Sequence, residues 1–325
     1  MKMHSRMAWF AAVAVFVAAA MSAVVAQPVA AATPTCFGNP ATIFGSGSIM
    51  GTPVNDVIVG SSGDDTIDGQ GGNDLICGLE GDDVIQGGLW NDSVDGGPGS
   101  DFMNGDLLSF EAVDLMCVGG KDLLRGGSGD DLIAGDCTVE TEDPTAGHIT
   151  GTGGNDAILG GGGIDFLAGD HNGNDVSATG GNDVIHGGAG DDGANGDSVA
   201  TSLVSGASGD DTISGGAGSD FFLLGDSAVF TCEGVITADG GDDVIGGGSG
   251  NDALIVGDHD PVCGIPSGRS GNDRLSGGHG DDALHGDNQT DTGDPVVDSG
   301  HGRDACNGGA GTDTAALCEF VTNVP

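Results

Sequence analysis

The sequence predicts an all-β fold in which short parallel strands stack into a one-dimensional solenoid. Two observations lead to this prediction. From Gly51 onward the chain reads in units of nine residues with the pattern G-G-x-G-x-D-x-U-x, where U is apolar. Glycine also makes up 67 of the 325 residues, and only 4% of the chain is aromatic. Such a chain lacks the large side chains that fill the core of a conventional enzyme domain of this length.

The charge balance excludes some classes of protein and favours another. The chain has 50 acidic residues against 7 Lys and Arg, for a formal net charge of −43, and 44 of the acids are Asp. Nucleic-acid binding is not expected, because phosphate contacts need Lys and Arg. Plain disorder is disfavoured by a mean hydropathy near zero and a hydrophobic content of 37%. The excess of Asp beside so much Gly therefore points to a bound cation.

The first 32 residues have the pattern of a secretory signal peptide. Lys2 and Arg6 precede an apolar run that ends in small residues, with cleavage options after Ala26 and after Ala32. The run is long enough to raise the alternative of a retained anchor, but its small-residue end favours cleavage. We therefore expect a secreted protein with no membrane span after cleavage.

The repeat continues almost to the end of the chain. Allowing for degenerate copies, there are 20 units; the sixth position is Asp in all 20, and the fourth is Gly in all but two, where Val54 and Trp90 stand. A Gly-rich turn tolerates positive φ and leaves its amides and carbonyls free to face inward. The next three residues form a short strand whose middle side chain points inward. Stacking of these strands predicts a buried apolar ladder through Ile58, Ile67, Ile76 and Ile85 and on to Ile245, Leu254, Leu275 and Leu284.

These units resemble the RTX family of hemolysin-type calcium-binding repeats, whose nonapeptide has the same pattern. The resemblance spans residues 51–316. It implies a parallel β-roll, a right-handed β-solenoid with two nonapeptides per coil, in which Ca²⁺ lies between successive turns and is held by turn carbonyls and by the Asp that closes each turn. On this chain it implies two columns of ligands. The first column is Asp56, Asp74, Asp92, Asp122, Asp156, Asp183, Asp211, Asp243, Asp273 and Asp304. The second is Asp65, Asp83, Asp101, Asp131, Asp165, Asp192, Asp220, Asp252, Asp282 and Asp313.

Seven insertions interrupt the regular spacing. Up to Asp101 the second column advances by 18 residues per coil, and beyond it by 27 to 34. Every insertion follows the strand of the second column and opens with Gly-Asp, so we expect seven enlarged loops along one edge. The recurring Asp is either a replacement calcium ligand or the start of an Asx-turn, and the sequence leaves both readings open. The residues concerned are Asp106, Asp136, Asp170, Asp197, Asp226, Asp258 and Asp287.

Eight cysteines in an exported chain indicate disulfides. Eight cysteines allow 105 connectivities, so the stacking of coils has to select among them. Cys117 and Cys137 flank neighbouring loops, as do Cys232 and Cys263, and Cys306 and Cys318 close the last coil. The pairs Cys117–Cys137, Cys232–Cys263 and Cys306–Cys318 are therefore predicted, with Cys36–Cys77 as the fourth.

No catalytic constellation is present in the sequence. The chain contains no H-E-x-x-H, no G-x-S-x-G and no phosphate-binding G-K-[ST] ending. The histidines are expected mostly at solvent-facing turn or strand-end positions, as for His186, His279, His285 and His301. The sequence thus predicts a protein that is not an enzyme.

The resulting prediction is a secreted β-roll that folds on binding several extracellular Ca²⁺ ions and has a structural or interaction role. The alternative is a surface- or polysaccharide-recognising adhesin, or an accessory to an extracellular enzyme or toxin, whose apolar loop residues form the recognition face. Against that alternative, these residues could instead fold back under the loops. The expected organisation is a signal peptide (1–32), an N-terminal cap (33–50), a regular roll (51–104), a roll with inserted loops (105–316) and a C-terminal cap (317–325).

Overall fold

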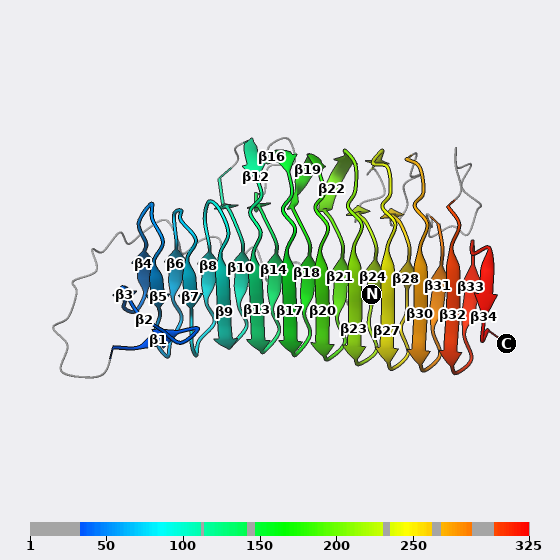
Figure 1. The fold of residues 1–325 in the computed structure, drawn as a ribbon, viewed down its shortest axis with the longest axis horizontal. Helices are drawn as coiled ribbons and strands as arrows, with labels where there is room; N and C mark the ends of the chain where they lie inside the picture. The colour runs from blue at the N-terminus through cyan, green and yellow to red at the C-terminus, as the bar shows by residue number, and fades with distance from the viewer. Residues whose placement is uncertain are drawn as a thin grey trace.

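The chain forms a parallel β-roll, as predicted. The computed structural model describes residues 33–111, 114–141, 147–229, 235–261, 268–287 and 302–324, and within them it contains strands and no helix. Each coil contributes one strand to each of two long parallel sheets that face one another along the molecule (Figure 1). None of the described residues forms a helix long and apolar enough to cross a membrane.

Sheet I has 12 strands among the described residues, and each pairs in parallel with the corresponding strand of the next coil. These strands are β3 (Ile43–Phe44), β5 (Val57–Val59), β7 (Leu75–Cys77), β9 (Ser93–Pro98), β13 (Leu123–Ser128), β17 (Ala157–Gly162), β20 (Val184–Ala189), β23 (Thr212–Ala217), β27 (Val244–Ser249), β30 (Arg274–His279), β32 (Ala305–Ala310) and β34 (Phe320–Thr322).

Sheet II has 11 described strands and forms the opposite wall. They are β4 (Ser48–Met50), β6 (Thr66–Asp68), β8 (Val84–Gln86), β10 (Phe102–Asn104), β14 (Leu132–Ala134), β18 (Phe166–Ala168), β21 (Gly193–Asn195), β24 (Phe222–Leu224), β28 (Ile255–Val256), β31 (Ala283–His285) and β33 (Thr314–Ala316).

The glycines of the repeat allow successive turns to stack in direct contact. Gly97 has φ 109°, and a Cβ there would collide with the carbonyl oxygen of Leu79 in the preceding coil. Gly129 has φ 130° and stands in the same relation to the carbonyl oxygen of Gly99. Only glycine satisfies both the positive φ and the close approach.

A single row of apolar side chains fills the space between sheets I and II. Ile58, Ile76 and Ile85 are among its members with 0% exposure, and one residue per strand continues the row to Leu284 and Cys306. Insertions do not disturb it, because Ile158 of β17 still pairs in register with Leu124 of β13 and Ile185 of β20. The apolar ladder predicted from the eighth positions therefore holds along most of the roll.

One predicted member of this ladder is wrong. Leu254 is half-buried on the outer side, and Ile255 takes the interior position, in register with Leu223 and Leu284. Leu223, and not the eighth-position Phe222, likewise occupies the core one coil earlier. The Phe222 ring instead lies over Gly193, where a Cβ would come within 2.7 Å of it. A phenyl ring would overpack a row built for Ile and Leu, and the one-residue shift that turns Phe222 outward continues into the next coil.

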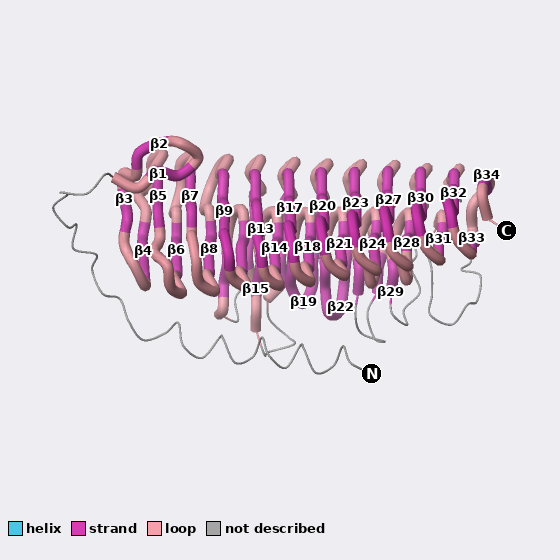
Figure 2. The backbone as a smooth tube through the Cα atoms, turned by 90° about the horizontal axis from the view of Figure 1, so that it is seen from below, coloured by secondary structure: helices cyan, strands magenta, loops and turns pink. Residues whose placement is uncertain are grey.

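The inserted segments form a third parallel sheet rather than only loops. Sheet III lies along one edge of the roll (Figures 1 and 2) and has nine described strands. They are β11 (Leu108–Ser109), β12 (Leu115–Val118), β15 (Thr138–Val139), β16 (His148–Thr152), β19 (Asn172–Thr179), β22 (Val199–Ser205), β25 (Ala228–Val229), β26 (Val235–Ile236) and β29 (Asp260–Pro261).

Sheet III has its own apolar core. Ile149, Val176 and Val229 are fully buried there, and Leu107 packs against them. Apolar residues such as Leu107 and Val229 thus fold back beneath the strands, whereas Met116, Val118 and Val235 of the same sheet are exposed. Phe230, part of the same apolar stretch in the sequence, lies outside the described residues. The expectation of protruding loops was therefore incomplete: the insertions stack on one another as the regular turns do.

Disulfides lie at both ends of the roll. The antiparallel hairpin of β1 (Thr35–Cys36) and β2 (Asn39–Pro40) is joined to β7 by Cys36–Cys77, and Cys306–Cys318 ties the last coil to the C-terminal segment. A third disulfide, Cys117–Cys137, lies in sheet III. All three are pairs that the sequence predicts, whereas Cys232–Cys263 falls outside the described residues.

Candidate metal centres

The sixth-position aspartates form two continuous hydrogen-bonded ladders. In the column that precedes sheet I, the backbone N–H of each aspartate donates to Oδ1 of the aspartate in the next coil at 2.7–2.9 Å, from Asp56 to Asp304. The column that precedes sheet II repeats this at 2.8–3.1 Å, from Asp65 to Asp313. Each strand therefore begins with its backbone anchored to a carboxylate of the following coil.

The second carboxylate oxygen of nearly every ladder aspartate is buried and has no hydrogen-bond partner. These oxygens are Oδ2 of Asp74, Asp83, Asp92, Asp101, Asp122, Asp131, Asp156, Asp165, Asp183, Asp192, Asp211, Asp220, Asp243, Asp252, Asp273, Asp282, Asp304 and Asp313. A buried anionic oxygen left unpaired is costly. Its repetition at the same place in successive coils points to a component that the protein atoms alone do not supply.

The first aspartate of each column differs from the rest. Oδ2 of Asp56 accepts hydrogen bonds from the backbone N–H and the hydroxyl of Thr52, and Oδ2 of Asp65 accepts one from the backbone N–H of Ser61. Both belong to the predicted ligand columns. Their second oxygen is already engaged by their own turn, so they fit a cation less well than the aspartates that follow.

Carbonyl oxygens of the glycine turns lie close to the unpaired oxygens. A Cβ on Gly69 would lie 2.7 Å from Oδ2 of Asp74 and would collide with the carbonyl oxygen of Gly87. Gly105 stands in the same relation to Asp122 and to the carbonyl oxygen of Gly135. Carboxylate and carbonyl oxygens in an irregular cage form the donor set that suits a hard cation such as Ca²⁺.

The seven aspartates that open the insertions, here called the closing aspartates, bring the two ends of each insertion together. Asp170 accepts hydrogen bonds from the backbone N–H of Gly181 at 3.1 Å on Oδ1 and 3.0 Å on Oδ2, and Asp287 accepts one from Gly302 at 3.0 Å. Asp106, Asp136, Asp197, Asp226 and Asp258 make the equivalent bond. The acceptor and donor are 11 to 18 residues apart, so this contact is not a local Asx-turn.

The closing aspartates also lie beside the column that precedes sheet I. Carboxylate oxygens of Asp106, Asp122 and Asp136 come within 4.8 Å of one another, and all three residues are buried. Oδ1 of Asp106 has no hydrogen-bond partner, and neither has Oδ2 of Asp226 or Asp258. The inserted coils therefore concentrate more buried negative charge than the regular ones.

The pKa values of the buried aspartates are raised where these carboxyl groups lie close together. Burial, followed by the charges of Asp156 and Asp106, raises the pKa of Asp122 to about 10. Burial likewise raises the pKa of Asp273 to about 10 and that of Asp131 to about 8. Without a cation, these carboxyl groups are held towards their protonated form at neutral pH.

The acid next to each ladder aspartate has a different role. Asp130 is exposed, and its Oδ1 accepts a hydrogen bond at 2.9 Å from the backbone N–H of Ile164 in the next coil. Asp64 and Asp82 make the same contact to the following coil. The paired acids of the repeat are thus a buried ladder residue beside a solvent-facing turn residue.

Glu319 is a member of the ladder that the nonapeptide pattern did not predict. Its Oε2 accepts a hydrogen bond at 2.7 Å from the backbone N–H of Asp304, in the place of an aspartate from a next coil. Oxygens of Asp287, Asp304 and Glu319 lie within 4.8 Å of one another. Its position in the sequence could have indicated this role, because Glu319 is the last acidic residue of the chain and follows Cys318, which is disulfide-bonded to the last coil.

Two buried histidines were also missed. His186 and His279 are exposed as expected and His301 is not described, but His285 is half-buried. His171 and His259 are fully buried, each directly after a closing aspartate, with Nδ1 at 3.7 Å from Oδ2 of Asp136 and of Asp226 respectively. The Gly-Asp-His triplet occurs at both positions, and this repetition could have predicted that the two histidines occupy equivalent places in the fold.

Comparison with known proteins agrees with this geometry. A family model described as the RTX calcium-binding nonapeptide repeat (4 copies) matches residues 50–85, 78–107, 118–136, 148–167, 169–199, 203–227, 235–254, 267–293 and 289–315. No curated protein matches the chain.

Proposed function

Since the chain belongs to the family of RTX calcium-binding nonapeptide repeats, we propose that it is a secreted, non-catalytic β-roll that folds when extracellular Ca²⁺ fills its aspartate columns. The observation that carries the proposal is the row of buried Oδ2 atoms without hydrogen-bond partners. These atoms and the neighbouring turn carbonyls would hold the ions, and the bound Ca²⁺ would supply charge neutralisation and cross-links between coils.

The closing aspartates would add ligands in the inserted coils. Their carboxylates adjoin the first column, and Asp106, Asp226 and Asp258 each keep one buried oxygen without a partner. A carboxylate can accept the amide of the returning chain with one oxygen and contact a cation with the other. This dual role would replace the ligands that the interrupted turn no longer provides.

Cation binding would be coupled to folding. A formal net charge of −43 keeps the calcium-free chain expanded through self-repulsion. Burial of ladder carboxylates such as Asp122 becomes favourable only when their charge is compensated, so binding energy becomes folding energy. Extracellular calcium modules typically bind at about 10⁻⁴–10⁻³ M, so the chain would fold after export.

Secretion is proposed from the pattern of residues 1–32, which lie outside the described residues. Three disulfides in the described part of the chain are consistent with an oxidising compartment.

A structural or interaction role is favoured over recognition by the insertions. Leu107 and Val229 pack into the core of sheet III and so are not available to a glycan or cell-surface partner, which leaves exposed residues such as Met116 and Val118 as the apolar surface of this sheet.

Circular dichroism with calcium titration tests the proposal. We expect the mature chain to gain β signal between EDTA and millimolar Ca²⁺, with Mg²⁺ at equal concentration giving much less, because Mg²⁺ demands a regular octahedron. Equal β content in EDTA and in Ca²⁺ would overturn the coupling of folding to calcium.

A further inference from the structure

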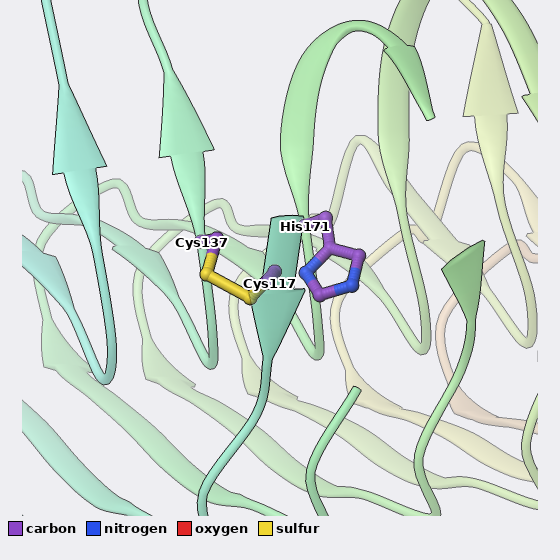
Figure 3. Close-up of side chains that lie close together, drawn as sticks. All are labelled: Cys117, Cys137 and His171. Carbon is purple, nitrogen blue, oxygen red and sulfur yellow. A yellow bond between two sulfur atoms is a disulfide. The ribbon is translucent and has the colours of Figure 1, made fainter. Parts of the chain in front are cut away.

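A second cluster of metal-ligating side chains lies within sheet III, apart from the calcium columns. It consists of Cys117 in β12, Cys137 just before β15 and His171 just before β19 (Figure 3). Cys137 and His171 hold equivalent places in adjacent coils, because each follows a closing aspartate and precedes paired strands. The two sulfurs and one ring nitrogen of His171 lie within 4.8 Å of one another, and all three residues are buried.

His171 has no hydrogen-bond partner for either ring nitrogen, although it is 0% exposed. Leaving a buried imidazole unsatisfied is costly. The nearest carboxylate oxygen is Oδ2 of Asp136, at 3.7 Å from Nδ1, beyond hydrogen-bond length.

We propose that Cys117, Cys137 and His171 form a Zn²⁺ site in the reduced chain, which the Cys117–Cys137 disulfide closes in the oxidised chain. A dithiol reductant would open the site by passing two electrons and two protons to the disulfide, and would itself become a disulfide. Zn²⁺ would then displace both thiol protons and bind two thiolates and the imidazole.

The ligand chemistry separates this site from the calcium columns. Thiolate and imidazole select Zn²⁺ over Ca²⁺, whereas the all-oxygen columns favour the hard cation.

Zinc titration of the intact chain tests the site. The protein is first folded in millimolar Ca²⁺ in its oxidised form and is then treated with a water-soluble phosphine under anaerobic conditions. Zn²⁺ is added against a chromophoric chelator. We expect the reduced chain to bind one Zn²⁺ that the oxidised chain does not bind. X-ray absorption of this zinc should show sulfur at about 2.3 Å and nitrogen at about 2.0–2.1 Å.

Two variants and a control separate this site from the other cysteine pairs. C117S/C137S should remove the additional zinc. H171Q keeps every cysteine and can be checked for folding while oxidised; it should weaken zinc binding more than about 10-fold. H186Q changes an exposed histidine and should leave the affinity unchanged. Unaltered zinc affinity in H171Q or unaltered zinc content in C117S/C137S overturns the proposal, as does equal binding by the oxidised chain.

Discussion

The backbone N–H of Asp122 donates to Oδ1 of Asp156 at 2.7 Å, across 34 residues of sequence. Asp74 makes the same bond to Asp92 across only 18 residues, also at 2.7 Å. The length of this ladder hydrogen bond therefore does not depend on how many residues separate the two aspartates. Because the inserted residues leave after sheet II and return before the next ladder aspartate, the regular coil geometry survives every insertion.

The ladder predicts opposite effects of one substitution with and without calcium. D131N keeps an oxygen that can accept the N–H of Asp101 but removes the charge of a buried carboxylate. We expect the calcium concentration at the folding midpoint to rise roughly 10-fold, because one ligand loses its charge. In EDTA the same variant should be more stable than the parent, because no buried charge remains unpaired there.

The neighbouring residue supplies the matched control. D130N makes the same chemical change at an exposed position whose side chain caps the next coil. Its calcium midpoint, followed by circular dichroism, should stay close to that of the parent. Equal shifts in D130N and D131N would show that overall charge, and not the buried oxygen, governs calcium-dependent folding.

Acidification should stabilise the calcium-free roll. Burial raises the pKa of Asp131 to about 8 and of Asp122 to about 10, against about 3.9 in an unfolded chain. At pH values between the unfolded and the folded pKa, the folded state binds more protons than the unfolded state. The free energy of unfolding of the calcium-free roll therefore falls as pH rises through this range. In EDTA we expect more β signal at pH 5.5 than at pH 8.5, both above the sequence pI of about 4.1. A β signal that rises with pH would contradict this.

In the presence of calcium the pH effect reverses. Protons compete with Ca²⁺ for the same carboxylates. The calcium midpoint should therefore increase as pH falls from 8.5 to 5.5, measured by titration at each pH. A midpoint independent of pH would argue against the ladder carboxylates as ligands.

The closing aspartates can be tested at Asp106. In the parent chain, Oδ2 of Asp106 accepts the N–H of Gly120 at 2.8 Å, and Oδ1 has no partner. D106N keeps one oxygen that can accept this N–H and replaces the unpaired oxygen with an amide NH₂. We expect the variant to fold in calcium and to bind fewer ions, measured by elemental analysis after gel filtration. An unchanged calcium content would leave Asp106 only the role of joining the ends of its insertion.

The last coil should depend on Glu319. E319A removes the acceptor for the N–H of Asp304, whereas E319Q keeps an acceptor and removes the charge. Loss of the contact should cost on the order of 1 kcal/mol, seen as faster hydrogen exchange in β32 and β33. If E319Q exchanges like the parent in calcium, Glu319 is a capping acceptor. If E319Q exchanges like E319A, its charge takes part in cation binding.

Much of this protein is determined by local sequence. The nonapeptide specifies a turn that needs glycine, an aspartate that closes it and a three-residue strand, so repetition alone predicts a parallel roll and its two ladders. Ile58, Ile76 and Ile85 could be assigned to the core because the period of nine never varies there.

Tertiary structure decided what the period does not encode. The choice of Ile255 over Leu254 for the core depends on how a neighbouring phenylalanine fits over Gly193, and the third sheet depends on insertions of different length stacking on one another. The burial of His171 beside Cys117–Cys137 and the ladder position of Glu319 arise likewise from contacts between coils. A repeat specifies the contacts that recur in each unit. Contacts that occur once depend on the packing of particular side chains from residues distant in the sequence, and only the folded chain brings these together.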